Sequence, residues 1–154
     1  MLDLYVELRG IAAALDTAHI GYALAGGLAV SIYAAPRATD DIDLVVAAQD
    51  VARIAETLAP LGFRRAGRAM PVAGGRIEIH RLLKFEGADL LPLDLLVLVD
   101  AELARRLDDR IERTLEGQRL WIIGLDSLRA LKRLRGSTLD RADLEALGEG
   151  PDVR

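Results

Sequence analysis

The residues with the clearest chemical potential are Asp41 and Asp43, in the segment Arg37-Ala-Thr-Asp-Asp-Ile-Asp. Side chains at i and i+2 of a β-strand lie on one face, about 7 Å apart. Two carboxylates at this spacing suit Mg²⁺, which completes its shell with water and phosphate oxygens. The alternative is an edge strand with ordinary polar alternation.

A third aspartate, Asp94, interrupts the nearly all-apolar run from Leu90 to Val99. An isolated carboxylate in such a strand is costly unless it is paired or binds metal. If this strand lies beside the strand of Asp41, three carboxylates converge and suit two divalent ions about 3.5–4 Å apart. The alternative is that Asp94 pairs with an arginine on a neighbouring strand, such as Arg81.

A glycine pair, Gly26-Gly27, precedes a predicted helix over 28–33. Glycines here let the backbone approach a triphosphate and direct free N–H groups toward it, whereas the alternative is a simple tight turn. Arg37 is a candidate phosphate clamp and Thr39 a candidate support for the loop. The alternative for the arginine is a solvated surface residue.

Basic residues gather on a C-terminal helix and form the last candidate site. Lys132 accompanies Arg129, Arg133 and Arg135 there. The interpretation is either a solvated basic face or a phosphate-facing lysine. An RNA acceptor would bind through these four cations in a salt-sensitive complex.

The composition indicates one globular domain that works without cysteine chemistry. The chain has 154 residues, 51% of them apolar, a net charge of −4 and no cysteine. These values disfavour a strongly basic nucleic-acid binder and exclude disulfides and thiolate catalysis. The most apolar run, 21–36, is too short to span a bilayer, and the first residues lack the basic start of a signal peptide. We expect a cytoplasmic protein without membrane contact.

Periodicity predicts an α/β architecture with one domain over 1–147 and a C-terminal tail over 148–154. The first half should alternate helix and strand, and β-structure should follow from Phe63 onward. A hairpin and two helices should complete the chain. The expected elements are a helix over 4–15 that closes by Gly21, a strand over 22–25, the helix over 28–33, a strand over 41–46, a helix capped by Asp50, strands over 63–68, 76–85 and 90–99, a hairpin of 111–115 with 119–123, a helix from Asp126 to Leu134 and a helix from Asp140 to Leu147.

Taken together, Ala25-Gly26-Gly27, the segment 37–44 and Leu93-Asp94-Leu95 resemble the polymerase-β-type nucleotidyltransferase superfamily. Its signature is Gly-Gly or Gly-Ser, a short spacer, Asp-x-Asp and a later strand aspartate. The closer resemblance is to small stand-alone bacterial proteins related to AbiEii-type toxins and to minimal nucleotidyltransferases.

The C-terminal region extends this resemblance over most of the chain. Leu131-Lys132, Gly136, Asp140 and Asp143-Leu144 are similar to the helix pair of that group. Ser137 stands where the group usually has arginine, and Leu139 where lysine is common. The contacts of that loop therefore differ from the group's pattern.

The resemblance implies a mixed β-sheet flanked by helices and a C-terminal helix pair. It implies that Gly26 and Gly27 lie near an NTP triphosphate, that Asp41 and Asp43 bind two Mg²⁺ (or Mn²⁺) ions and that Asp94 binds the catalytic one. Lys132 would be a phosphate contact.

The implied function is transfer of an NMP from an NTP to a hydroxyl of a tRNA end, a partner protein or a small molecule. The setting would be a toxin–antitoxin or defence system with a cognate partner. The alternative is a catalytically silent member of such an operon, which binds nucleotide or partner only.

Overall fold

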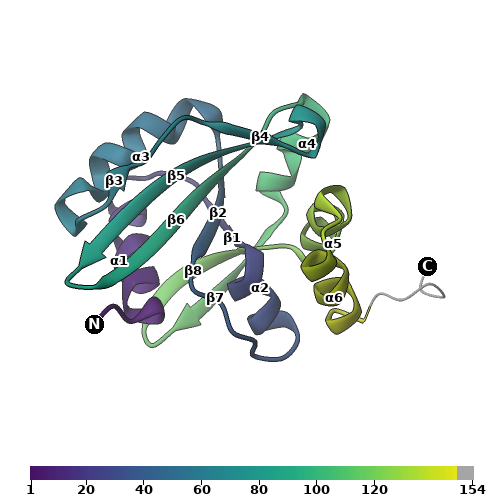
Figure 1. The fold of residues 1–154 in the computed structure, drawn as a ribbon, viewed down its shortest axis with the longest axis horizontal. Helices are drawn as coiled ribbons and strands as arrows, with labels where there is room; N and C mark the ends of the chain where they lie inside the picture. The colour runs from purple at the N-terminus through teal and green to yellow at the C-terminus, as the bar shows by residue number, and fades with distance from the viewer. Residues whose placement is uncertain (149–154) are drawn as a thin grey trace.

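One eight-stranded mixed sheet organises the protein, as the computed structural model shows for residues 1–148 (Figure 1). The predicted α+β class with a mixed sheet is confirmed. The helices are α1 (Leu4–Thr17), α2 (Gly26–Tyr33), α3 (Val51–Leu58), α4 (Ala101–Ala104), α5 (Leu125–Arg135) and α6 (Thr138–Ala146), and the strands are β1 (Ala23–Ala25), β2 (Ile42–Val46), β3 (Arg64–Arg65), β4 (Met70–Val72), β5 (Ile77–Glu86), β6 (Asp89–Leu98), β7 (Arg110–Leu115) and β8 (Gln118–Ile123).

The strand order brings together segments that are distant in sequence. It runs β3-β5-β6-β2-β1-β8-β7, and β4 pairs with β5 outside this path. β2 is antiparallel to β1 and parallel to β6, so Asp43 lies opposite both Ala25 and Asp94. β6 is buried over most of its length, as expected for a central strand with an apolar sequence.

Helices α1 and α3 pack against each other and lie behind the sheet in Figure 1. Their buried residues follow the helical period, as in Leu8, Ile11 and Leu15 of α1 and Ile54 and Leu58 of α3. Helices α5 and α6 form the predicted C-terminal pair, and α2 contacts both. The helix pair thus stands beside the glycine end of α2.

Three helix ends differ from the sequence prediction. Asp50 precedes α3 but makes no capping hydrogen bond, and Asp126 lies in the first turn of α5, whose N-cap is Gly124. α6 begins before Asp140, because Ser137 is its N-cap and forms a capping box with that aspartate. Asp50 thus has the predicted N-cap position without the side-chain bond, whereas α5 and α6 begin at residues before the predicted ones.

The end of α1 also differs from the prediction, which placed it at Gly21. His19 adopts a positive φ of 57°, and the Ile20 N–H donates to the carbonyl of Leu15 at 2.9 Å. This 6→1 bond is the one that closes a Schellman motif, in which glycine is the usual left-handed residue. His19 therefore takes the left-handed position that ends the helix, whereas the sequence predicted that Gly21 would end it.

The region between α3 and β5 is the least like its prediction. The strand expected over 63–68 is reduced to β3, and Gly67 interrupts the extended run with a φ of 75°. β4 and α4 were not predicted, because each is short and β4 contains Pro71. No helix within residues 1–148 is long and apolar enough to cross a membrane. The predicted tail over 148–154 lies outside the described residues, except for Gly148.

Candidate active site

The structure brings Asp41, Asp43 and Asp94 together. Asp43 is on β2, Asp41 directly precedes that strand, and Asp94 is opposite Asp43 on β6. One carboxylate oxygen from each residue lies within 4.8 Å of the other two. The alternation of β2 and its register with β6 cause this convergence, since paired residues on neighbouring strands share a face.

The three carboxylates repel one another in a partly buried setting. Burial raises the pKa of Asp43 to about 7, and the charges of Asp41 and Asp94 add to this effect. Burial also raises the pKa of Asp41, with further contributions from Asp94 and Asp40. The Thr39 hydroxyl donates to Asp41 at 3.4 Å and opposes that shift. Such a cluster of hard oxygen ligands fits a divalent cation.

Arg81 contacts the cluster from β5, where it lies opposite Asp94. Its Nε donates to one oxygen of Asp94 at 2.7 Å and its Nη2 to the other at 2.9 Å. The arginine partner that the sequence offered as an alternative is therefore present together with the cluster. The two arrangements are compatible, because a carboxylate has about four acceptor sites. Arg81 thus fixes the orientation of Asp94.

The glycine pair forms the first turn of α2 and leaves no space for side chains. Gly26 has a φ of 64°, and a Cβ there would overlap the Asp43 carboxylate, with the Cγ only 2.7 Å away. A Cβ on Gly27 would lie 2.8 Å from both Arg37 Nη2 and Thr39 Oγ1. The first N–H groups of a helix have no acceptor within it, so they are available beside the carboxylates.

Lys132 and Arg37 converge on one buried carboxylate of α6. The Lys132 Nζ lies 2.8 Å from Asp143 and 3.2 Å from Asp140, and the Arg37 Nε lies 2.8 Å from Asp143. Although burial alone would raise the pKa of Asp140, hydrogen bonds from Ser137 and the Lys132 charge hold it below its usual range. Lys132 is only 7% exposed, so the interpretation as part of a solvated face is wrong for this residue.

The four cations expected to bind an RNA acceptor do not form one open surface. Arg129 Nη2 donates to the carbonyl of Leu147 at 2.7 Å and so joins α5 to the end of α6. Lys132 is buried in the same helix pair. Two of the four therefore act within the fold.

A pocket of about 550 Å³ is lined by all the predicted metal and phosphate residues, and of the four predicted RNA-binding cations by Lys132 and Arg135. The sequence predicted no site role for Met70, Val72 or Ile79. It offered Arg135 only as a cation for an RNA acceptor, and Arg81 only as an ion-pair partner. The alternation of side chains along β5 could have predicted that Ile79 shares a face with Arg81. The residues of β4 have no sequence pattern that predicts a strand. The lining residues are Gly26, Gly27, Arg37, Ala38, Thr39, Asp40, Asp41, Asp43, Met70, Val72, Ile79, Arg81, Asp94, Lys132, Arg135, Ser137, Leu139 and Asp140.

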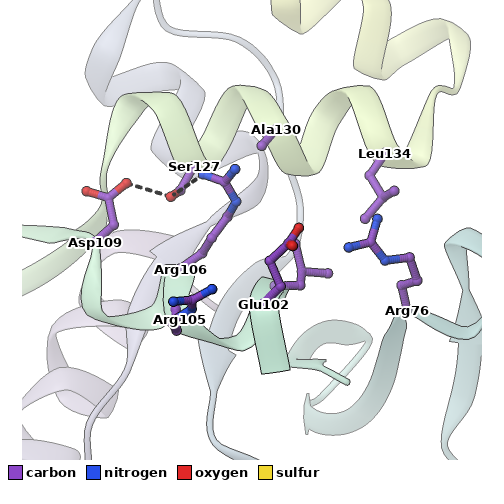
Figure 2. A pocket seen from close by; sticks show the side chains of 9 residues that line it. Arg76, Glu102, Arg105, Arg106, Asp109, Ser127, Ala130 and Leu134 are labelled. Carbon is purple, nitrogen blue, oxygen red and sulfur yellow. Dashed lines mark hydrogen bonds between the residues drawn. The ribbon is translucent and has the colours of Figure 1, made fainter. Parts of the chain in front are cut away.

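A second hollow, of about 420 Å³, lies beside α5 and the segment from α4 to β7 (Figure 2). The buried Ser127 hydroxyl donates to Asp109 at 2.5 Å and accepts from Arg106 Nη1 at 3.1 Å (Figure 2). These bonds give the buried Ser127 hydroxyl its partners and tie the first turn of α5 to the segment between α4 and β7.

Comparison with known proteins gives a result at the level of structure only. No family model matches this chain, and no curated protein matches it. An antigenic nucleotidyltransferase-like protein from Paracoccidioides brasiliensis is 18% identical, with 92% of this chain and 72% of that one covered and a TM-score of 0.64. The chain has a nucleotidyltransferase-like fold.

Two proteins that were solved with bound ligands share this fold. ANT(2″)-Ia, solved in complex with adenylyl-2″-tobramycin, is 16% identical over 93% of this chain and 84% of its own, with a TM-score of 0.62. The lincosamide antibiotic adenylyltransferase LnuA, solved with lincomycin, is 18% identical over 93% and 95%, with a TM-score of 0.60.

Replacement of Gly26 by alanine should disrupt the cluster. Gly74 is a matched control, since its φ is 66° and a Cβ there meets nothing within 4 Å. Both variants should lose about 1–2 kcal/mol of stability from the left-handed backbone. Only Gly26→Ala should also weaken Mn²⁺ binding, by roughly 10-fold or more, because its Cβ displaces Asp43. Calorimetric titration measures this, and equal affinities in the two variants would contradict the geometry.

The metal-free protein should become less stable as pH rises from about 4 to about 7. The folded state holds the Asp43 proton up to a pKa of about 7, against 3.8 ordinarily, so the unfolded state binds fewer protons in this window. At pH 8 in EDTA, Asp43→Asn should be more stable than wild type by roughly 1–3 kcal/mol, and the gain should shrink toward pH 4. Chemical unfolding at several pH values tests this, and a gain that does not vary with pH would refute the assigned cause.

Removal of the Asp143 carboxylate should destabilise the helix pair. Asp143→Ala leaves Lys132 and Arg37 without their shared partner and should cost about 3–5 kcal/mol in urea unfolding. Asp126 is the control, because its side chain is 90% exposed in its ion pair with Arg129. Asp126→Ala should change stability by no more than about 0.5 kcal/mol. Similar losses in both variants would show that the buried network is unimportant.

Proposed function

We propose that this protein is a metal-dependent nucleotidyltransferase that moves an NMP from an NTP to an acceptor hydroxyl. The observation that carries the proposal is the convergence of Asp41, Asp43 and Asp94 beside the glycine turn of α2. The names of two structural neighbours, an antibiotic adenylyltransferase and ANT(2″)-Ia with its adenylylated product, support the same class of reaction.

Asp41 and Asp43 would hold two Mg²⁺ or Mn²⁺ ions, and Asp94 would hold the ion nearer the acceptor. Such ions lower the pKa of an attacking hydroxyl and neutralise a pyrophosphate leaving group. The raised pKa of Asp43 supports this role, because a group of like charges is relieved by a cation. Arg81 would keep Asp94 in the orientation for binding.

The triphosphate would lie at the start of α2. Gly26 and Gly27 place backbone N–H groups at the positive end of the helix, and neither glycine adds a side chain of its own there. Arg37 and Thr39 lie against Gly27, and Lys132 lines the same pocket. We therefore assign these residues to the phosphates, with Asp143 holding both cations in place.

The transfer step balances without any other reagent. The acceptor oxygen forms a bond to the α-phosphorus, and the bond from that phosphorus to the bridging oxygen of the β-phosphate breaks. Pyrophosphate leaves with the electron pair, and the hydroxyl proton passes to Asp94, which lies on the acceptor side. Positioning and charge neutralisation supply the catalysis.

The narrower assignments stay predictions from the sequence. They comprise the grouping with AbiEii-type toxins, a toxin–antitoxin or defence setting with a cognate partner, a cytoplasmic location and a tRNA or protein acceptor. The motif residues of the resemblance are what supports them. The acceptor and the cognate partner are tested by offering tRNA and the products of neighbouring genes as acceptors in the assay below.

The protein would be incubated with each α-³²P-labelled NTP, MgCl₂ and candidate acceptors. The label should pass to the acceptor, and unlabelled pyrophosphate should be released. Asp41→Asn, Asp43→Asn and Asp94→Asn should each reduce transfer by roughly 10²-fold or more. Asp126→Asn, at a side chain 90% exposed, should retain it. Transfer that survives the loss of Asp43 would refute the mechanism.

A further inference from the structure

One wall of the active-site pocket is apolar and has no part in the function proposed above. Met70 and Val72 come from β4, Ile79 from β5 and Leu139 from the first turn of α6. Met70 is 49% exposed and Leu139 55% exposed. Two large apolar side chains from different elements thus face one polar cavity.

Strand register places this wall directly beside the carboxylates. Asp43, Asp94 and Arg81 form one row across β2, β6 and β5. The next row on the same face contains Leu96, Ile79 and Met70, since Leu96 pairs with Ile79 and Ile79 with Met70. A molecule seated on Met70 and Ile79 would therefore lie one residue pair, about 7 Å along the strands, from Asp94.

The strand order indicates which substrate uses this wall. Gly26 follows β1 on one side of β2, and β6, β5 and β4 lie in succession on the other side. In an in-line transfer the attacking and leaving oxygens lie on opposite sides of the phosphorus. If pyrophosphate leaves toward the glycine turn, the acceptor must approach from the side of β5 and β4.

The charges on this side disfavour a cationic acceptor. Arg81 projects from β5 with a side chain 43% exposed, and Arg135 lines the pocket from α5. No described lining residue from β4 or β5 carries a carboxylate. Glu78 alternates onto the opposite face of β5 from Ile79, where it pairs with His80 at 2.7 Å.

We propose that the acceptor is a small hydroxyl compound with an apolar body and no positive charge, which packs on Met70, Ile79 and Leu139. This proposal rests on the nucleotidyltransferase function. Apolar burial on the wall would supply affinity, and the position of the wall would present a hydroxyl to the carboxylate row. A polycationic acceptor would meet Arg135, and it would have to compete with Arg81 for the Asp94 carboxylate.

The chain contains only two methionines, Met1 and Met70, so methyl-labelled methionine gives two NMR signals. Met1 is fully exposed beside Glu86 and serves as an internal control. Full-length protein with Mg²⁺, with and without α,β-methylene ATP, would be titrated with phenyl β-D-glucoside, methyl β-D-glucoside or kanamycin. The phenyl glucoside should shift the Met70 signal alone, and the other two compounds should not shift it.

Leu139→Glu provides a second measurement. Glutamate in the first turn of α6 suits the helix dipole, so the variant should fold. It should weaken binding of phenyl glucoside by about tenfold, which corresponds to about 1.4 kcal/mol of lost apolar contact. Val6→Glu, an exposed aliphatic residue in the first turn of α1, should bind as wild type does.

The outcomes separate this proposal from the function on which it rests. A Met70 shift with kanamycin and none with phenyl glucoside, or equal binding by Leu139→Glu and Val6→Glu, would overturn the acceptor class. Neither result would contradict the proposed NMP transfer, which is tested separately by its dependence on Asp43. Absence of any NTP transfer, with a Met70 shift still present, would overturn the enzyme function but keep the apolar site.

Discussion

The parallel pairing of β2 with β6 is the contact on which the rest of the site depends. It places Asp43 opposite Asp94, although like charges directly opposite each other destabilise a sheet. Apolar burial on the other face of these strands offsets this electrostatic repulsion, because Ile42, Leu44 and Leu93 are wholly buried there. Arg81, opposite Asp94 on the next strand, offsets part of the charge. The core thus holds an arrangement that the carboxylates alone would oppose.

A second polar centre joins the helix pair to the loop that carries the aspartates. Asp143 is shared by Lys132 of α5 and Arg37 of that loop. Ser137 has a structural role here, because it is the N-cap of α6 and forms a capping box with Asp140. That capping box also fixes the carboxylate that contacts Lys132. Ser137 therefore supports the wall of the pocket.

The outline of this fold is readable from local pattern, and its details depend on packing. The apolar stripe of α1 and the apolar run of β6 were predicted, since burial imposes those periods directly. Asp126 was wrong as a cap, because Gly124 takes the N-cap position of α5, whereas Asp50 is at the N-cap position of α3 but makes no side-chain capping bond. β4 was missed because a short strand with a proline has no period of its own.

The sequence by itself predicted which residues could hold metal and phosphate, because the residue types and the i, i+2 spacing of Asp41 and Asp43 are local properties of the chain. Only the tertiary structure decided their partners. Asp94 joins both the cluster and Arg81, and Lys132 is buried between carboxylates, because strand register and helix docking join residues far apart in the chain. The apolar wall at Met70 has the same origin, since it exists only where β4, β5 and α6 meet.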